Sequence, residues 1–175
     1  MSRFIRLATE TDIKELEQLY DAINDYLATN INYTGWKKGI YPNRDTAVKG
    51  IRDHCLYVAM KENTIVGSFL LRHEPEPAYF TVKWNVDLSY DNIYVIYTFV
   101  VHPDYHGDGI GQFMLDFITS HSIEEKMSSI RLDVYEKNTP AIQLYKKCGF
   151  QYINTVDLGL GCYGLKWFQL YEKLL

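Results

Sequence analysis

Hydrophobic side chains recur with two different periods along this chain, and each change of period marks a change from strand to helix. Residues 4–8 (FIRLA) alternate apolar and polar positions, which predicts a short strand. Acidic residues follow a capping threonine, Thr9 or Thr11, as is typical of a helix start. The apolar positions that follow lie on one helical face, at Ile13, Leu16, Tyr20, Ile23 and Leu27.

The middle of the chain alternates between loops and apolar runs. A loop (31–45) leads to a short helix near 45–54, and residues 55–72 predict a hairpin around the turn KEN. An irregular aromatic stretch (78–90) precedes residues 92–101 (NIYVIYTFVV), an apolar run suited to a central strand.

The last third predicts two helices and three strands. A helix is expected over 109–126, a strand over 128–138, and a second helix over 139–150, with Thr139 as cap and Pro140 at its first position. Two closing strands follow at 152–158 and 165–175. The sequence therefore predicts one domain, 1–175, of the mixed α/β class with about seven strands and four helices.

Composition limits the function further. The net charge of −4 argues against a nucleic-acid surface, and no apolar run is long enough to span a bilayer. The first twenty residues lack the apolar core of a signal peptide, so we expect a cytoplasmic protein. The widely spaced Cys55, Cys148 and Cys162 fit neither a disulfide framework nor a zinc site, and we expect reduced, mostly buried thiols.

Candidate chemistry centres on residues 99–115 (FVVHPDYHGDGIGQFML), where three alternating glycines precede a helix. A dinucleotide fingerprint needs G-x-G-x-x-G, and the spacing here is G-x-G-x-G, although Asp133 lies near the expected acidic position. A P-loop lacks its Gly-Lys-Ser/Thr. His102, Asp104, His106 and Asp108 suggest a metal, but no further ligand cluster completes the shell.

Two interpretations of the glycines remain. They could permit a tight turn through positive φ angles. Alternatively, successive backbone N–H groups at a helix start could bind a phosphate without side-chain charge, which suits an acidic protein. Three alternating glycines favour the anion cradle.

Two motifs resemble the GNAT superfamily of N-acetyltransferases. Val101-His102-Pro103 and the following run His106–Gly111 are similar to the family's acetyl-coenzyme A (acetyl-CoA) motif, and NTPAIQLYKKCGF (138–150) is similar to its second element. The order of elements fits from about residue 3 to the end. The resemblance implies a mixed sheet whose fourth and fifth strands splay apart at the coenzyme.

The resemblance also implies roles for individual residues. The backbone of Phe99, Val100 and Val101 would bond the pantetheine arm, one N–H there would stabilise the oxyanion, and Asn138 would lie near the arm. Tyr145 would protonate the departing thiolate. The pyrophosphate would be bound by the loop, whose candidate residues are His106, Gly107, Asp108, Gly109, Ile110 and Gly111. His106 stands where the family usually has Arg or Gln, and this departure predicts a pH-dependent affinity for the coenzyme.

The resemblance implies direct transfer of acetyl to an amine in a ternary complex, without a metal. The acceptor, a small-molecule or peptide amine, is expected at the irregular aromatic segments, and the candidates are Trp36, Tyr41, Glu74, Tyr94 and Tyr97. The irregular segments are 35–42 and 73–87, and packing of their aromatics, Trp36, Tyr41, Tyr79 and Trp84, on the core is an equal alternative.

The general base is open between Asp91, Glu74 and a water relay past Tyr94 or Tyr97. An acyl-CoA-binding sensor without catalysis is the alternative function. The last strands could also leave a sheet edge for a second copy of the chain.

Overall fold

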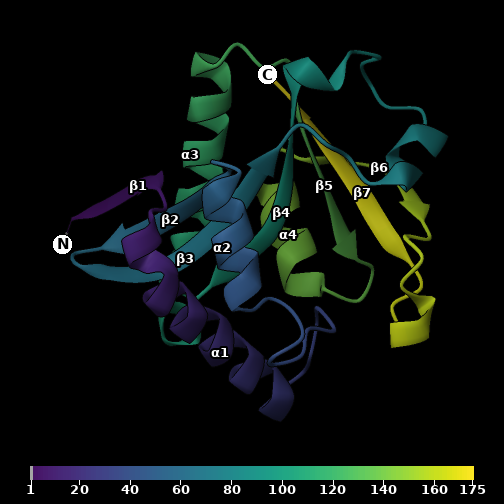
Figure 1. Ribbon diagram of the computed structural model, residues 1–175. Coiled ribbons are helices and arrows are strands. Elements are labelled where there is room, and N and C mark those ends of the chain that lie inside the picture. The colour runs from purple at the N-terminus through teal and green to yellow at the C-terminus, as the bar shows by residue number, and fades with distance from the viewer. Residues whose placement is uncertain (1) are drawn as a thin grey trace. The chain divides into compact units, whose positions relative to one another are not determined.

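A computed structural model describes residues 2–175, and its elements follow the predicted order (Figure 1). Within these residues there are seven strands and four α-helices. The chain divides into two compact units. The N-terminal unit contains residues up to 32, 36–71 and 97–114, and the C-terminal unit contains 33–35, 72–96 and 115–175.

The strands follow the order β1-β2-β3-β4-β5-β7-β6. Of the pairings with a defined register, β4–β5 is parallel and β1–β2, β2–β3, β5–β7 and β6–β7 are antiparallel. The strand β4 (Ile93–Val101) passes from the C-terminal unit into the N-terminal unit. Its parallel ladder joins Ile93–Ile96 to Ser129–Leu132 and ends before either strand does. The mixed α/β fold is confirmed.

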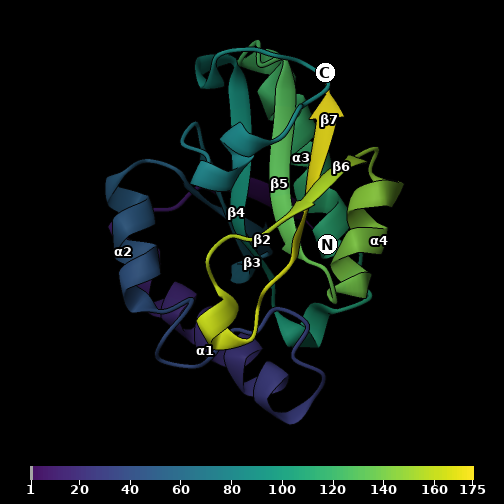
Figure 2. The same ribbon diagram turned by 90° about the vertical axis from the view of Figure 1, so that its right-hand side faces the viewer.

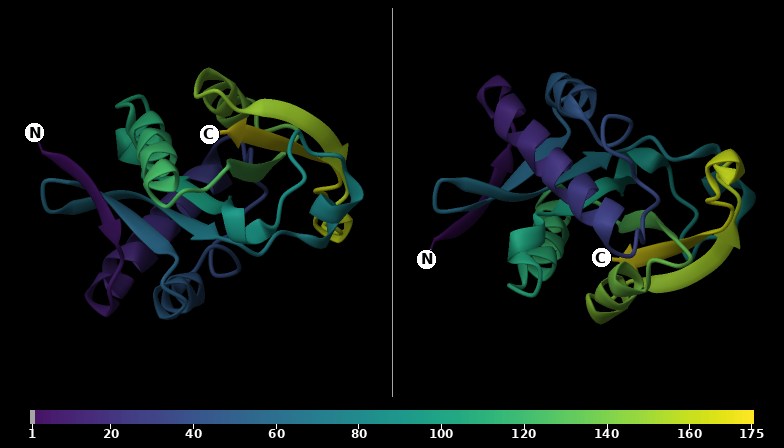
Figure 3. Two further views of the ribbon diagram at one scale, coloured as in Figure 1. Left: turned by 90° about the horizontal axis from the view of Figure 1, so that it is seen from above. Right: turned by 90° about the horizontal axis from the view of Figure 1, so that it is seen from below.

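The N-terminal unit is built on β1 (Arg3–Leu7), β2 (Leu56–Lys61) and β3 (Thr64–Arg72). Helices α1 (Ile13–Thr29) and α2 (Arg44–Arg52) lie side by side on one face of these strands (Figures 1 and 3). The helical period predicted most of the buried face of α1, because Leu16, Tyr20, Ile23 and Leu27 are buried. Leu19 is buried as well, whereas the predicted Ile13 is only half-buried.

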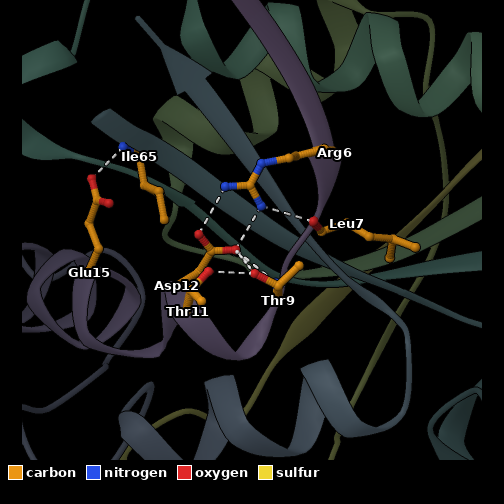
Figure 4. Close-up of polar contacts among 7 residues, drawn as sticks. All are labelled: Arg6, Leu7, Thr9, Thr11, Asp12, Glu15 and Ile65. Carbon is orange, nitrogen blue, oxygen red and sulfur yellow. Dashed lines mark hydrogen bonds and ion pairs between the residues drawn. The ribbon is translucent and has the colours of Figure 1, made fainter. Parts of the chain in front are cut away.

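The start of α1 is fixed by a charged pair (Figure 4). Thr9 caps a single 3₁₀ turn, Glu10–Asp12, that leads into the helix. The Arg6 guanidinium donates to both oxygens of Asp12, at 2.7 and 2.9 Å, and the backbone N–H of Thr9 donates to the same carboxylate at 2.8 Å. One turn later, Glu15 accepts the backbone N–H of Ile65 at 2.7 Å. These contacts tie the helix to β1 and β3.

The C-terminal unit is built on β5 (Ser129–Tyr135), β7 (Phe168–Leu174) and β6 (Gln151–Val156), with α4 (Thr139–Lys147) beside β6 and β7 (Figures 2 and 3). The helix α3 (Ile110–Glu124) begins in the N-terminal unit and continues into this one. The predicted cap of α4 is wrong by one residue. Asn138 is the N-cap, because its side-chain oxygen accepts the N–H of Ala141 at 3.4 Å, while Thr139 is already helical.

The cysteines differ from the prediction. All three are free, but only Cys55 is buried, whereas Cys148 is half-buried and Cys162 is exposed. The expectation of mostly buried thiols is therefore wrong, because Cys162 lies in an exposed 3₁₀ turn and Cys148 closes α4 at its C-terminal end. None of the helices within residues 2–175 combines the length and apolar character that crossing a bilayer requires.

Candidate active site

The strand β4 departs from regular geometry at Thr98, in the segment expected to face the thioester. Thr98 has φ of +48°, a left-handed conformation that is rare for a β-branched residue. Its buried hydroxyl is hydrogen-bonded to the phenol oxygen of Tyr41. The strained backbone therefore re-aims the N–H and C=O groups of the residues that follow, which include Phe99, Val100 and Val101.

A close approach at Gly67 positions the end of β4. A Cβ on Gly67 would lie 2.8 Å from both the carbonyl oxygen of Val100 and the sulfur of Met114. Beside it, the N–H of His102 donates to the carbonyl of Val66 at 2.9 Å. Strand β3 therefore contacts both the end of β4 and the N-terminal half of α3. The glycine loop connects these two segments.

The loop presents a row of backbone donors. Gly107 and Gly109 have φ of +86° and +76°, and a Cβ at either position would meet open space, so these glycines are required for their φ angles. Ile110, only 1% exposed, anchors the first turn of α3 in the core. Within residues 2–175, no hydrogen bond uses the N–H groups of Gly107, Gly109, Ile110 or Gly111. The residues present therefore fit the pyrophosphate of acetyl-CoA.

The acid in the loop is neutralised locally. Lys61, at the end of β2, lies 3.0 Å from the Asp108 carboxylate and 4.9 Å from the ring centroid of Tyr105. The N–H of Asp108 donates to the carbonyl of Tyr105 at 3.2 Å. Asp108 therefore stabilises the loop, and its charge is offset by the ammonium of Lys61.

Both histidines of the loop contact backbone groups. The Nε2 of His106 lies 3.3 Å from the carbonyl oxygen of Val101, and its exposed ring packs edge-on against Tyr26 at 5.2 Å. The Nδ1 of His102 accepts the N–H of Asp104 at 3.2 Å. In the described part of the chain, no three His, Cys, Asp or Glu side chains are grouped as a metal would require.

Tyr145 lies in the C-terminal unit, on α4, with 6% of its surface exposed. Its ring packs edge-on against Phe150, with 5.9 Å between the ring centroids. Burial raises the pKa of Tyr145, and the negative charge of Asp133 raises it further. The phenol is therefore protonated throughout the neutral range, as a proton donor must be. Asn138, seven positions before Tyr145 and expected near the pantetheine arm, uses its side-chain oxygen to cap the same helix.

Two groups that the sequence did not single out as site residues meet in the same unit. The fully buried Tyr79 donates its hydroxyl proton to Asp133 on β5, at 2.6 Å. Burial raises the pKa of Asp133 to about 6, although the hydrogen bond from Tyr79 acts in the opposite direction. The sequence signal for Asp133 is an acid late in an apolar strand, and that position also fits a dinucleotide fingerprint.

Three of the expected acceptor residues gather in the N-terminal unit. The rings of Trp36 and Tyr41 meet edge-on at 5.8 Å, and Tyr41 is bonded to Thr98. Trp36 and Tyr97 both pack against the hydrophobic core of that unit. These aromatics therefore have packing roles at the irregular part of β4, and Tyr41 is 40% exposed beside it.

The other two expected acceptor residues lie in the C-terminal unit. The ring of Tyr94 stacks on His73 at 4.8 Å and on His121 at 6.0 Å, and burial raises the pKa of its phenol. Glu74 is exposed beside His73.

A buried ion pair fixes the aromatic segment of this unit. Arg131, on β5, donates to Glu172 at 3.1 Å and to the carbonyl oxygen of Val86 at 2.7 Å. Its guanidinium lies 4.1 Å from the ring centroid of Trp84, a cation–π contact. For Trp84, the packing interpretation of the aromatic segments is therefore the one the structure supports.

Within residues 2–175, N–H groups that no hydrogen bond uses stand at the start of α3, shortly after β4, and such an arrangement in an α/β protein suits a phosphate group. The sequence model described as "Acetyltransferase (GNAT) family" matches residues 16–150. The chain belongs to the GNAT acetyltransferase family.

Curated relatives match over parts of the chain. Streptothricin acetyltransferase of Escherichia coli is 28% identical over 106 residues, which are 61% of this chain and 52% of that protein. Spermine/spermidine N(1)-acetyltransferase of Bacillus subtilis is 37% identical over 60 residues, 34% of this chain and 40% of that protein. UPF0157 protein YqkA of B. subtilis is 42% identical over 74 residues, 42% of this chain and 21% of that protein. The chain thus spans about half or less of the curated relatives it matches.

Solved structures share the fold over nearly the whole chain. A GNAT-family acetyltransferase of Streptococcus agalactiae superposes with a TM-score of 0.78 at 20% identity, covering 99% of this chain and 95% of that one. The protein yncA of Salmonella typhimurium, solved with its cofactor acetyl-CoA, gives a TM-score of 0.71 at 13% identity and covers 100% and 95%. At these identities the likeness concerns the fold.

Proposed function

We propose that the protein transfers the acetyl group of acetyl-CoA to the nitrogen of an amine acceptor, by direct attack in a ternary complex. The observation that carries this proposal is the set of backbone N–H groups of Gly107, Gly109, Ile110 and Gly111, which no hydrogen bond uses within residues 2–175. Membership of the GNAT family supports acetyl-CoA as the ligand of that row. Acetyl-CoA supplies a thioester, which an unprotonated amine can attack without an acyl-enzyme.

This chain's own residues serve binding and proton transfer. The N–H groups of Gly107, Gly109, Ile110 and Gly111 would bind the pyrophosphate, and the α3 dipole would favour its charge. Backbone groups of the segment 99–101, re-aimed by the φ angle of Thr98, would bond the pantetheine amides. A backbone N–H in that segment would polarise the carbonyl under attack. Tyr145, kept protonated by burial, would donate to the departing sulfur.

The acceptor class is a cationic amine. Two relatives carry names that specify spermine or spermidine and streptothricin, all of which bear amino groups. The segment 73–87 combines aromatic rings with carboxylates, a combination that attracts ammonium groups.

Thiol release is the experiment that tests this function. Acetyl-CoA is incubated with the protein and a panel of amines containing spermidine, spermine, a peptide with a free α-amine and an aminoglycoside, while thermal unfolding is followed in parallel. We expect acetyl-CoA to raise the melting temperature and at least one amine to release coenzyme A. Stabilisation without turnover of any amine would instead support the acyl-CoA sensor, and absence of both would refute the cradle as a coenzyme site.

A further inference from the structure

Asp133 is a carboxylate on β5 that has no ion-pair partner among residues 2–175. Among residues 2–175 its one hydrogen-bond donor is Tyr79, at 2.6 Å, and it forms no ion pair. Glu172 in the same unit is the opposite case. It accepts from Arg131 at 3.1 Å, from Ser129 at 2.8 Å and from the N–H of Asn85 at 2.9 Å. The buried Glu172 is therefore saturated with partners, whereas Asp133 keeps spare acceptor capacity.

The surroundings of Asp133 suit a bound ammonium group. Tyr79 bonds one carboxylate oxygen, Oδ2, and Oδ1 has no donor among residues 2–175. Asp133 as a whole residue is half-buried, and within the described residues Oδ1 is not one of the fully enclosed side-chain atoms that lack a partner. Trp84 holds Tyr79 in place, because its indole N–H donates to the carbonyl of Tyr79 at 2.8 Å and the two rings lie 5.3 Å apart. A carboxylate beside aromatic rings is a common arrangement for binding a cationic amine.

Asp133 also interacts with the expected proton donor. Its negative charge contributes to the raised pKa of Tyr145, which places the two groups within electrostatic reach in one unit. The Asp133 carboxyl itself titrates near pH 6, below physiological pH, so it is ionised when an amine arrives and can accept a proton. Amine acetylation requires a proton donor with a high pKa and a proton acceptor with a lower pKa.

We propose that Asp133, positioned by the hydroxyl of Tyr79, binds the protonated acceptor amine and accepts its proton before attack. This inference rests on the proposed function and supplies the base for which the apolar strand 92–99 offers no carboxylate.

The proton balance follows directly. The ammonium group transfers one proton to Asp133, and the free amine attacks the thioester carbonyl, forming the C–N bond as the C–S bond breaks. The nitrogen loses a second proton, and the sulfur gains one from Tyr145. Tyr145 recovers its proton from the second proton of the nitrogen, and Asp133 releases its own to solvent. The products are an acetamide, free coenzyme A and one proton.

The test compares Asp133→Asn, Tyr79→Phe and the control Asp157→Asn with the wild type. Asp157 is an exposed acid of the same unit that accepts a backbone N–H from Gly159, so its change to Asn removes the same charge elsewhere. For each protein, kcat/KM for spermidine is measured from pH 5 to 9, acetyl-CoA binding by thermal shift, and spermidine binding by calorimetry.

We expect Asp133→Asn to lower kcat/KM by about 100-fold or more, the usual contribution of a general base. The fall in wild-type activity below about pH 6 should disappear, while the thermal shift with acetyl-CoA stays unchanged. Tyr79→Phe removes a hydrogen bond to the ionised carboxylate, so the acidic limb should move to higher pH. Asp157→Asn should match the wild type.

Two results would overturn the assignment. One is an Asp133→Asn variant that keeps both its activity within threefold and its acidic limb. The other is equal spermidine affinity in the wild type and Asp133→Asn, and this calorimetric comparison decides the matter even if the wild type turns over no amine. Failure of acetyl-CoA to stabilise any of the four proteins would instead count against the proposed function.

Discussion

Carboxylates of this protein differ mainly in the donors that surround them. Asp12 is bonded to Arg6, so its pKa lies below the usual range, and its charge stabilises the fold. Among residues 2–175 Asp133 has only a tyrosine donor, and burial raises its pKa to about 6. The ionised Asp12 therefore stabilises the fold. Ionisation of Asp133 lowers the free energy of unfolding, as is common for groups that act on a ligand.

The lowered pKa of Asp12 leads to a prediction about the stability of the fold at low pH. Because its pKa is lower in the folded than in the unfolded state, its contribution is complete above the unfolded value of about 4 and is lost as the pH falls through the folded value. Asp12→Asn should therefore reduce the free energy of unfolding at pH 7 by about 1 kcal/mol. Urea unfolding at pH 7 and pH 3 measures this, and the difference between variant and wild type should shrink at the lower pH. An equal difference at both values would argue against the ion pair.

Tyr145 gives a second prediction at this scale. Removing its hydroxyl with Tyr145→Phe keeps the buried ring and its contact with Phe150, so the fold should persist. A thiolate is a tolerable leaving group, and we expect kcat to fall by about 10- to 100-fold with little change in acetyl-CoA affinity. Steady-state thiol release measures the effect, with Tyr152→Phe, an exposed tyrosine of the same unit, as control. Unchanged kcat in Tyr145→Phe would remove its role as proton donor.

His106 leads to a third prediction for a single residue. If its imidazole meets the pyrophosphate, acetyl-CoA should bind more tightly below neutral pH than above it, because a protonated imidazole attracts phosphate more strongly than a neutral one. His106→Ala should lower the affinity and abolish that dependence. Titration calorimetry from pH 6 to 8 measures both effects, and identical affinities for the two proteins across this range would exclude the contact.

Among the elements, the junction of β3, β4 and α3 leaves no room for an added methyl group at Gly67. Gly67→Ala would place a methyl group 2.8 Å from the backbone oxygen of Val100, which cannot move without shifting β4. We expect a loss of about 1–3 kcal/mol in the free energy of unfolding, together with weaker acetyl-CoA binding. Gly161→Ala is the matched control, because no atom lies within 4 Å of the added methyl group. Equal denaturation midpoints for the two variants would contradict the close approach.

Elements were predictable because their signals are local. Apolar spacing gave the buried face of α1, and proline after a strand gave the start of α4 to within one residue. The error there has a physical cause: both Asn138 and Thr139 can cap a helix, and only the geometry shows which side chain accepts the N–H of Ala141.

The remainder of the site depends on long-range contacts. Tyr79 and Asp133 are 54 positions apart, and no local pattern joins them. The positive φ of Thr98 is equally unpredictable, because a β-branched residue in an apolar run favours regular strand geometry. By contrast, glycine permits positive φ angles, so the sequence located the turn before α3 at Gly107 and Gly109.

For the whole molecule, family membership and a cradle of free N–H groups lead to one central claim, acetyl transfer to an amine. The most direct measurement quantifies two products of the same reaction, free coenzyme A by thiol titration and acetylated amine by mass spectrometry, with spermidine as first acceptor and the rest of the panel after it. The account predicts equal amounts of both products in the wild type and a parallel reduction of both in Tyr145→Phe and Asp133→Asn. Coenzyme A release without any acetylated amine, or no reaction with any amine of the panel, would contradict it.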